Sequence, residues 1–380
     1  MEIADRVDRV PPSGIRRFFE IAEQVDDVIS LGVGEPDFSA PWAARAAAVD
    51  GLQRGRTSYT ANRGMRELRT AIAEDVRRHH LRYDPDEEIL VTTGVSEALD
   101  VAVRALVDAS DGVAIPGPTY VSYVPCARFA GATVIDVPTR SAEEFVLTRE
   151  RLRAAGAERA DLLLLCYPNN PTGAVMDERE LGEVAAFARE HDLLVVSDEV
   201  YADLRYDDEH VSIATLEGMR ERTVVLNGFS KAFAMTGLRL GYALGPPEAI
   251  AAMTKIHQYV MLSAPTPAQH AAIEALRSCG DAVEKMRDQY DRRRRFVLSR
   301  LHEMGIGCFE AEGAFYVFPS VPAGFDDAET FAEELLNGAG VAVVPGTAFG
   351  DAGAGHVRMS YATGIDELRE AMDRIEAFLN

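Results

Sequence analysis

Side chains that can carry chemistry stand beside short apolar runs in the middle of the chain. Gly94, Val95 and Ser96 follow one such run and open a helical pattern. The groups at the ends of the other runs are Tyr120, Asn170, Asp198, Glu199, Tyr201, Ser230, Lys231 and Arg239. In open α/β sheets, ligands bind beyond the carboxyl ends of the strands, where these groups would meet. We therefore expect them to share one site.

This set of groups matches the needs of a phosphorylated pyridine aldehyde. A phosphate requires a helix N-terminus and an arginine. The ring nitrogen requires a carboxylate, the phenolic oxygen a phenol or amide donor, and the flat ring an aromatic neighbour. The aldehyde requires a lysine amine. The set holds neither a Ser-His-Asp group nor a metal-ligand cluster, so the pattern favours this ligand over hydrolase or metal chemistry.

The elements that must position these groups are strands alternating with helices. Seven apolar runs predict seven strands, at residues 89–91, 113–115, 133–137, 162–166, 193–196, 224–226 and 240–244. Helical patterns lie between them, at 96–106, 178–189 and 247–260, which favours an α/β fold with a mostly parallel sheet. Only about a dozen residues separate Leu226 from Leu240, too few for a parallel return. The strand that begins near Arg239 is therefore expected to be antiparallel.

The pattern changes after about residue 275 of the 380. A long helix is expected at 280–304, a shorter one at 328–338 and a last one from Ile365, with short apolar runs between them. We expect a large domain at 45–275. The smaller α+β domain is expected to combine residues 1–44, an N-terminal arm, with residues 276–380.

The charge balance excludes several partners. The chain has 61 acidic and 39 basic residues, a formal charge of −22, and only three of the basic residues are lysines. Nucleic acids and anionic membranes require a cationic face, so neither is an expected partner. An acidic, lysine-poor composition indicates the cytoplasm of a salt-loving microbe, whereas the alternative, GC-biased coding, explains the excess of arginine over lysine but not the charge of −22. No apolar run approaches 18 residues, so a membrane span is not expected.

The cysteines predict neither disulfides nor a metal site. The chain has four, Cys126, Cys166, Cys279 and Cys308, and none forms a CxxC pair. Charges throughout the first 30 positions argue against a secretory signal. We therefore expect reduced thiols in a cytoplasmic protein.

Nine motifs in order resemble the class I pyridoxal-5′-phosphate (PLP) aminotransferases of fold type I, over essentially the whole chain. They are LGVGEPDF (31–38), TSYTANRG (57–64), VTTGVSEAL (91–99), PNNPTG (168–173), SDEVY (197–201), NGFSKAFAMTGLRLG (227–241), GAFYVFP (313–319), VPGTAFG (344–350) and VRMSYAT (357–363). The chain is most similar to the branch of aspartate and aromatic aminotransferases. The resemblance implies PLP as cofactor and a large domain with a seven-stranded sheet between helices.

The resemblance assigns roles around the cofactor ring. Lys231 resembles the lysine that forms the Schiff base, and Asp198 the partner of the pyridine nitrogen. Tyr201 and Asn170 resemble the two donors to the phenolic oxygen. Tyr120 takes the place of the aromatic residue that stacks on the ring, where other members have tryptophan. Lys231, Asp198 and Tyr201 are the expected catalytic residues.

The resemblance also assigns a phosphate site. Val95 and Ser96 match the backbone phosphate cradle, and Arg239 matches the phosphate arginine. Some members bind phosphate through a serine three residues before the lysine, a position that is glycine here, and Ser230 is expected to compensate. Tyr59 resembles the tyrosine that reaches the phosphate of the neighbouring subunit. This role requires a homodimer with shared active sites.

Three positions are expected to contact the substrate. Arg358 resembles the arginine that clamps the α-carboxylate, and Gly34 and Asn170 lie in motifs that contact the same group. The apolar stretch Ile15–Phe19 is expected to cover the substrate side chain. The resemblance thus implies transamination between an L-amino acid and a 2-oxo acid, with 2-oxoglutarate expected as acceptor. The resemblance also implies a ping-pong mechanism that proceeds through an aldimine on Lys231.

The donor and the reaction type stay open at this point. An aspartate donor requires a cation for its distal carboxylate, for which Arg16, Arg63 and Arg128 are candidates, whereas an aromatic donor requires an apolar slot. We expect donors in the aspartate and aromatic range, and alanine, branched-chain and kynurenine donors stay open. The same cofactor site also supports C–S lyases and other β-eliminating enzymes, and PLP-binding regulators. Such regulators carry an additional N-terminal DNA-binding domain, for which about 40 residues before the expected PLP domain leave little room.

Overall fold

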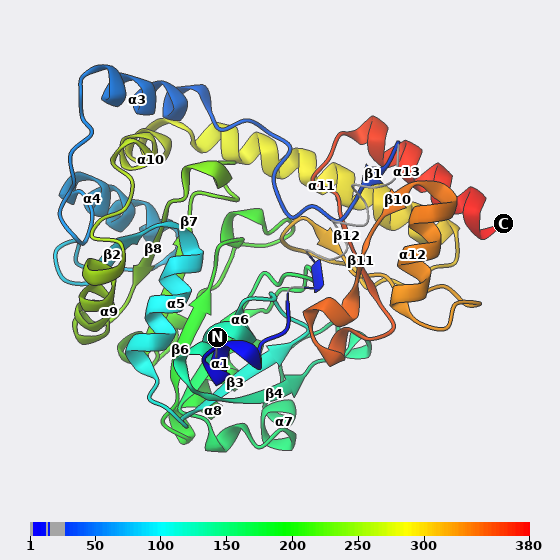
Figure 1. The fold of residues 1–380 in the computed structure, drawn as a ribbon, viewed down its shortest axis with the longest axis horizontal. Helices are drawn as coiled ribbons and strands as arrows, with labels where there is room; N and C mark the ends of the chain where they lie inside the picture. Colours follow the sequence, from blue (N-terminus) through cyan, green and yellow to red (C-terminus); the bar gives the residue numbers. More distant parts are fainter. Residues whose placement is uncertain (1–2, 13, 16–26) are drawn as a thin grey trace.

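The computed structural model describes residues 3–12, 14–15 and 27–380 (Figure 1). Its α-helices are α1 (Asp5–Asp8), α3 (Trp42–Gln53), α4 (Arg66–Asp75), α5 (Gly94–Leu106), α6 (Tyr123–Ala130), α7 (Arg149–Ala154), α8 (Glu178–Glu190), α9 (Pro247–Val260), α10 (Thr266–Ser278), α11 (Gly280–Glu303), α12 (Ala328–Ala339) and α13 (Ile365–Leu379). Its strands are β1 (Ile29–Ser30), β2 (Ile89–Thr92), β3 (Gly112–Gly117), β4 (Thr133–Pro138), β5 (Leu162–Cys166), β6 (Leu194–Asp198), β7 (Thr223–Gly228), β8 (Gly241–Leu244), β9 (Tyr316–Val317), β10 (Val341–Ala342), β11 (Val344–Pro345) and β12 (Val357–Ser360).

A seven-stranded sheet organises the first two thirds of the chain. Its order is β2-β8-β7-β6-β5-β3-β4, and every strand is parallel to the rest except β8. The prediction of seven strands and of one antiparallel return is confirmed. Gly228 at the end of β7 pairs with Gly241 at the start of β8. The antiparallel turn therefore brings Arg239 to the edge where the parallel strands end.

Helices cover both faces of this sheet. Successive residues of β2 point to opposite faces. On one face, Leu90 packs with α5, α6 and α9. On the other face, Ile89 and Val91 pack with α3, α4 and α10. Helices α7 and α8 pack on the latter side, farther along the sheet. Because parallel strands are buried on both faces, most of them are apolar throughout, but β4 at the edge is largely exposed. This α/β sandwich is the fold that the sequence predicts.

Local signals explain where several helices begin. Asp177 and Glu180 form a reciprocal capping box at the start of α8, and Asp327 accepts a hydrogen bond from the Thr330 amide at the start of α12. Prolines occupy the first turns of α9 and α10, where no intrahelical N–H partner is needed. The residues at which these helices begin are thus determined by neighbouring residues in the sequence, whereas the packing of the helices depends on the sheet.

A second hydrophobic core lies beyond the sheet. It joins α11, α12 and α13 to the short strands β9, β10 and β12. Figure 1 shows α11 running from α10 beside the sheet to α13 at the far end of the molecule. Strand β1, near the start of the chain, pairs with β10, so Ile29 and Ser30 lie beside Val341 and Ala342.

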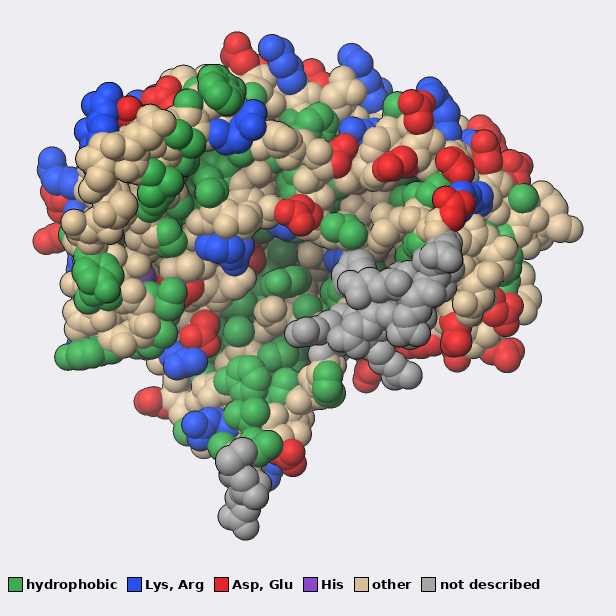
Figure 2. Space-filling view, turned by 45° about the horizontal axis from the view of Figure 1, so that its top comes forward, with side chains coloured by type: hydrophobic (Ala, Val, Ile, Leu, Met, Phe, Trp, Pro, Cys, Tyr) green, Lys and Arg blue, Asp and Glu red, His purple; other side chains and the backbone are tan. Residues whose placement is uncertain are grey.

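The surface mixes charged and apolar areas. Figure 2 shows acidic and basic side chains interspersed over one face, with a hollow near its middle where hydrophobic side chains gather. In the described part of the chain, no helix has the length and apolar character needed to span a membrane.

Candidate active site

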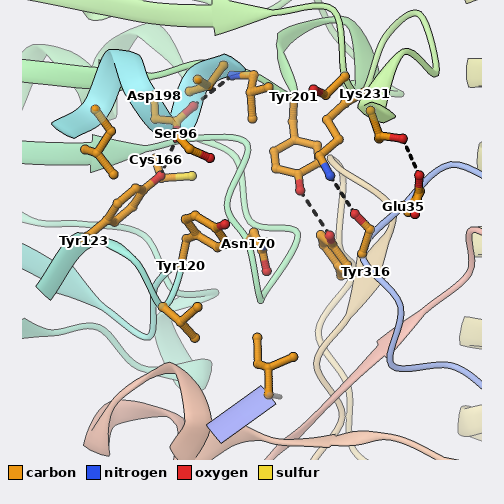
Figure 3. Close-up of a pocket in the computed structure, with 18 of the residues that line it drawn as sticks. Glu35, Ser96, Tyr120, Tyr123, Cys166, Asn170, Asp198, Tyr201, Lys231 and Tyr316 are labelled. Atoms are coloured by element: carbon orange, nitrogen blue, oxygen red, sulfur yellow. Dashed lines mark hydrogen bonds between the residues drawn. The ribbon is translucent and has the colours of Figure 1, made fainter. Parts of the chain in front are cut away.

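One cavity collects almost all of the residues that the sequence singled out. It has a volume of about 500 Å³ and lies at the carboxyl ends of the parallel strands, facing β9 and β12. The predicted residues that line it are Gly34, Val95, Ser96, Tyr120, Asn170, Asp198, Tyr201, Ser230, Lys231, Arg239 and Arg358. Figure 3 shows six of them around the cavity, Ser96, Tyr120, Asn170, Asp198, Tyr201 and Lys231, together with Glu35 and Tyr316.

One end of the cavity is built for close approach of an anion to backbone N–H groups. Helix α5 begins at Gly94, and Arg239 lies so near that a Cβ on Gly94 would stand 2.8 Å from its Nη2. A Cβ on Gly241 would stand 2.6 Å from the Val95 nitrogen. Because Gly94 and Gly241 have no side chains, the N-terminus of the 13-residue helix α5 and the Arg239 guanidinium lie close together. This is the donor set that binds phosphate.

A buried carboxylate lies at the end of β6. Asp198 is 5% exposed, and its Oδ2 accepts a hydrogen bond of 2.7 Å from the Tyr123 hydroxyl (Figure 3). Its Oδ1 accepts one of 3.2 Å from the Val200 amide. Burial raises the pKa of Asp198 to about 6, against the lowering effect of the Tyr123 hydrogen bond. The carboxylate is therefore held in a fixed orientation and would gain from a cationic partner.

A lysine amine stands opposite the carboxylate. Lys231 Nζ donates a hydrogen bond of 2.6 Å to the carbonyl oxygen of Gly34. Burial, and secondarily the positive charge of Arg358, lowers the pKa of Lys231 to about 8. About a tenth of this amine is thus uncharged at pH 7 and half of it at pH 8. Uncharged amine is the form that attacks a carbonyl and the form that accepts a proton.

A buried arginine completes the opposite wall. Arg358, on β12, is 3% exposed and donates from Nη1 to Asn170 Oδ1 (2.9 Å) and from Nη2 to the Gly32 carbonyl (2.6 Å). Its guanidinium lies 4.5 Å from the centre of the Tyr316 ring. Its Nε is buried without a hydrogen-bond partner in the described part of the chain. One donor of this guanidinium is therefore unpaired among the described residues.

Two tyrosines that sequence reasoning did not assign belong to this site. Tyr316 shares a hydrogen bond of 3.0 Å with the Tyr201 hydroxyl and sits against Gly34, where a Cβ would meet its hydroxyl at 2.6 Å. Tyr123 orients Asp198. Tyr316 lies inside the motif GAFYVFP, so the motif could have pointed to this residue, but no neighbouring residue in the sequence indicates its hydrogen-bond partner. Tyr123 follows Tyr120 by three residues, and the two rings pack edge to face at 5.6 Å.

Some predicted residues lie elsewhere. Tyr59 is 81% exposed and does not line the cavity. Neither Arg63 nor Arg128 lines the cavity, and the Nη1 of Arg63 donates to the backbone of Asp86 instead. Ile15 lines the cavity, whereas residues 16–19, and with them Arg16, lie outside the described residues.

Comparison with known proteins identifies the family. Residues 26–375 match the family model for class I and II aminotransferases. The putative aminotransferase YugH of Bacillus subtilis is 48% identical over 100% of this chain and 98% of its own length, and an aspartate aminotransferase of Pyrococcus abyssi is 46% identical over the same shares. The crystal structure of an aromatic aminotransferase from Pyrococcus horikoshii superimposes with a TM-score of 0.90 at 44% identity, covering 96% of this chain and 98% of that one. The chain therefore belongs to the class I and II aminotransferases, as an α/β enzyme of PLP fold type I that uses pyridoxal 5′-phosphate.

Proposed function

We propose that this enzyme transfers the amino group of an aspartate or aromatic L-amino acid to a 2-oxo acid, with 2-oxoglutarate as acceptor. The observation that carries the proposal is the placement of Lys231 and Arg358 in one cavity. A carboxylate held on Arg358 would keep the Cα of an amino acid within the space that the Lys231 amine faces. Relatives with aspartate and aromatic specificity in their names support the same donor range.

The donors in the cavity fit the cofactor part by part. Val95, Ser96 and Arg239 would hold its phosphate, with Ser230 beside them, and Asp198 would pair with its ring nitrogen. The donors to its phenolic oxygen would be Tyr201 and Asn170, and Tyr120 would lie against its ring. When bound, pyridoxal 5′-phosphate supplies the electron sink that makes the α-proton of an amino acid acidic.

The remaining residues would orient the substrate and move its proton. Arg358 would bind the α-carboxylate, with Asn170 fixing the guanidinium and Gly34 leaving room for close approach. Lys231 Nζ would act as general base and take the α-proton, since its lowered pKa leaves about a tenth of the amine uncharged at pH 7, far more than for an exposed lysine. Asp198 would remain ionised beside a cation, and the hydrogen bond from Tyr123 would keep it in place.

An exposed apolar surface supports a homodimer. Large hydrophobic side chains lie exposed at Trp42, Val49, Leu52, Tyr59, Tyr259, Val260, Met261 and Leu262, which we call the apolar face. The segment around Tyr59 is tied to the loop after α9, because Asn62 Nδ2 donates to the Leu262 carbonyl (2.7 Å) and Thr266 Oγ1 to the Ser58 carbonyl (2.8 Å). Burial of this face against a second copy would bring Tyr59 to the neighbouring phosphate. We place the dimer in the cytoplasm, where four free thiols stay reduced.

Half-reaction spectroscopy tests the proposal. The PLP-loaded enzyme is mixed with each of the twenty amino acids in turn, without an acceptor, in molar KCl. We expect aspartate or aromatic donors to convert the cofactor's absorbance to that of its amino form, and 2-oxoglutarate to restore it. Initial rates with both substrates should give parallel double-reciprocal lines. Ammonia release without an acceptor would contradict transamination and indicate an eliminating enzyme, whereas absence of any spectral change would indicate a PLP-binding regulator.

A further inference from the structure

A buried hydrogen-bonded pair lies directly behind the phosphate end of the cavity. Glu97, in the first turns of α5, faces His257 of α9, with 2.6 Å between Glu97 Oε1 and His257 Nδ1. The His257 side chain is fully buried and that of Glu97 is 10% exposed. Neither residue lines the cavity. The proposed chemistry uses neither, so the pair requires another explanation.

Glu97 caps the helix that would hold the phosphate. Thr93 is the N-cap residue of α5, but its side chain makes no capping hydrogen bond. The second carboxylate oxygen of Glu97, Oε2, accepts the backbone N–H of Thr93 instead. This bond is made one residue before Gly94 and two before Val95. The direction in which the first free N–H groups of α5 point therefore depends on the position of the Glu97 carboxylate.

His257 fixes that carboxylate. Because both oxygens of Glu97 act as acceptors, Nδ1 of His257 is the donor of their hydrogen bond. The other ring nitrogen, Nε2, is buried without a hydrogen-bond partner in the described residues, so Glu97 is the sole polar anchor of the ring. A fully buried imidazole has few alternative positions. Glu97 is thus held between a rigid ring on α9 and the cap of α5.

We propose that Glu97 and His257 are positioning residues for the cofactor phosphate, acting through the N-terminus of α5. The proposal rests on the assignment of Val95, Ser96 and Arg239 to that phosphate. Loss of either partner would let the first turn of α5 move relative to Arg239. The phosphate would then be bound by mobile N–H groups instead of preorganised ones. The lysine and the ring contacts would be unaffected.

Two aldehydes separate a phosphate effect from a general one. Pyridoxal 5′-phosphate and pyridoxal share the ring and the aldehyde, and only the first has a phosphate. We measure the affinity of the apoprotein for each by absorbance titration, in wild type, Glu97→Ala and His257→Ala. Both variants are expected to bind pyridoxal 5′-phosphate about tenfold more weakly, with pyridoxal affinity changed less than about twofold.

Conservative variants and a matched control sharpen the comparison. Glu97→Gln keeps an acceptor for Thr93, and His257→Asn keeps a donor at the place of Nδ1, so both should restore most of the affinity for pyridoxal 5′-phosphate. Thr254→Val removes a half-buried hydrogen bond of 2.6 Å to the Ile250 carbonyl on the same helix, one turn earlier, and should change neither affinity.

Distinct outcomes overturn distinct claims. An equal loss of affinity for both aldehydes in the alanine variants, or no loss at all, would overturn the positioning role. Equal affinity of the wild type for both aldehydes would refute the phosphate cradle itself, on which the proposal rests. Hydrogen exchange of the Thr93 amide in the wild-type apoprotein needs no variant. It is expected to be slow because Glu97 accepts this N–H, and fast exchange that only the cofactor suppresses would also overturn the role.

Discussion

The scarcity of lysine makes the proposed base directly measurable. The chain has three lysines, and Lys255 and Lys285 are exposed on helices α9 and α11, away from the cavity. Trace acetylation of the apoprotein with acetic anhydride labels only uncharged amines. Mass spectrometry of the three lysine peptides then gives the rate at each site between pH 6 and pH 11. Two internal references thus accompany every measurement of Lys231.

The expected difference is large. Burial lowers the pKa of Lys231 to about 8, whereas an exposed lysine titrates near 10.4. At pH 8, half of the Lys231 amines are free, compared with about 0.4% of an ordinary lysine. The free fraction is therefore about a hundredfold greater at Lys231. Its labelling rate should reach half of its maximum near pH 8, while the rates at the two reference lysines are still rising at pH 10.

The test rests on the pH at which labelling of Lys231 reaches half of its maximum rate. The absolute rate is not used, because burial also slows the access of acetic anhydride to the amine. A Lys231 profile that coincides with those of Lys255 and Lys285 would refute the reasoning. Arg358 provides a second check, since its charge is the second cause of the lowered pKa. Arg358→Gln should move the Lys231 midpoint to higher pH, and Arg358→Lys, which keeps the charge, should leave it closer to that of the wild type.

Four further predictions follow from the site and the surface. Arg358→Lys should raise KM for both substrates about 10- to 100-fold with the cofactor spectrum unchanged, because lysine cannot bind a carboxylate bidentately; an unaltered KM would contradict its role. Asp198→Asn should stabilise the apoprotein at pH 7.5 by about 1–3 kcal/mol in urea titrations, because burial raises the pKa of Asp198 from 3.8 to about 6 and the ionised form is the disfavoured one. The gain should grow between pH 4 and pH 6, and the same gain at pH 3.5 would argue against this cause. Tyr259→Asp, on the apolar face, should yield monomers in sedimentation and abolish turnover; an active dimer would exclude this face as the interface. The thermal midpoint should rise with KCl concentration if the acidic surface is adapted to salt, and full stability in dilute buffer would disprove that adaptation.

The sequence allowed the sheet and its edge to be predicted because both depend on short-range patterns. Apolar runs located all seven strands, and the short connection between β7 and β8 was enough to predict the antiparallel return. Residues at run ends lie near one another once the strands are parallel. Eleven of the twelve predicted site residues therefore line one cavity, and Tyr59 is the exception.

What the sequence did not reveal depends on contacts between distant segments. Tyr201 and Tyr316 are 115 residues apart, and no local pattern predicts their hydrogen bond. The same holds for the 75 residues between Tyr123 and Asp198 and for the pair of Glu97 and His257, which are 160 residues apart. A histidine within a helical pattern is ordinary, and only the packing of α5 on α9 gives it a partner.

The hydrogen bond between Lys231 and Gly34 has a consequence for how the protein is made. The two residues are 197 positions apart, and Arg358, on the opposite wall, lies near the end of the chain. During synthesis, Lys231 therefore leaves the ribosome well before Arg358 has been translated. A growing chain therefore has the reactive amine and the proposed phosphate donors before it has the arginine that would hold the substrate carboxylate. The cofactor contacts of this chain are thus translated ahead of its substrate contact, and binding of the aldehyde need not wait for β12.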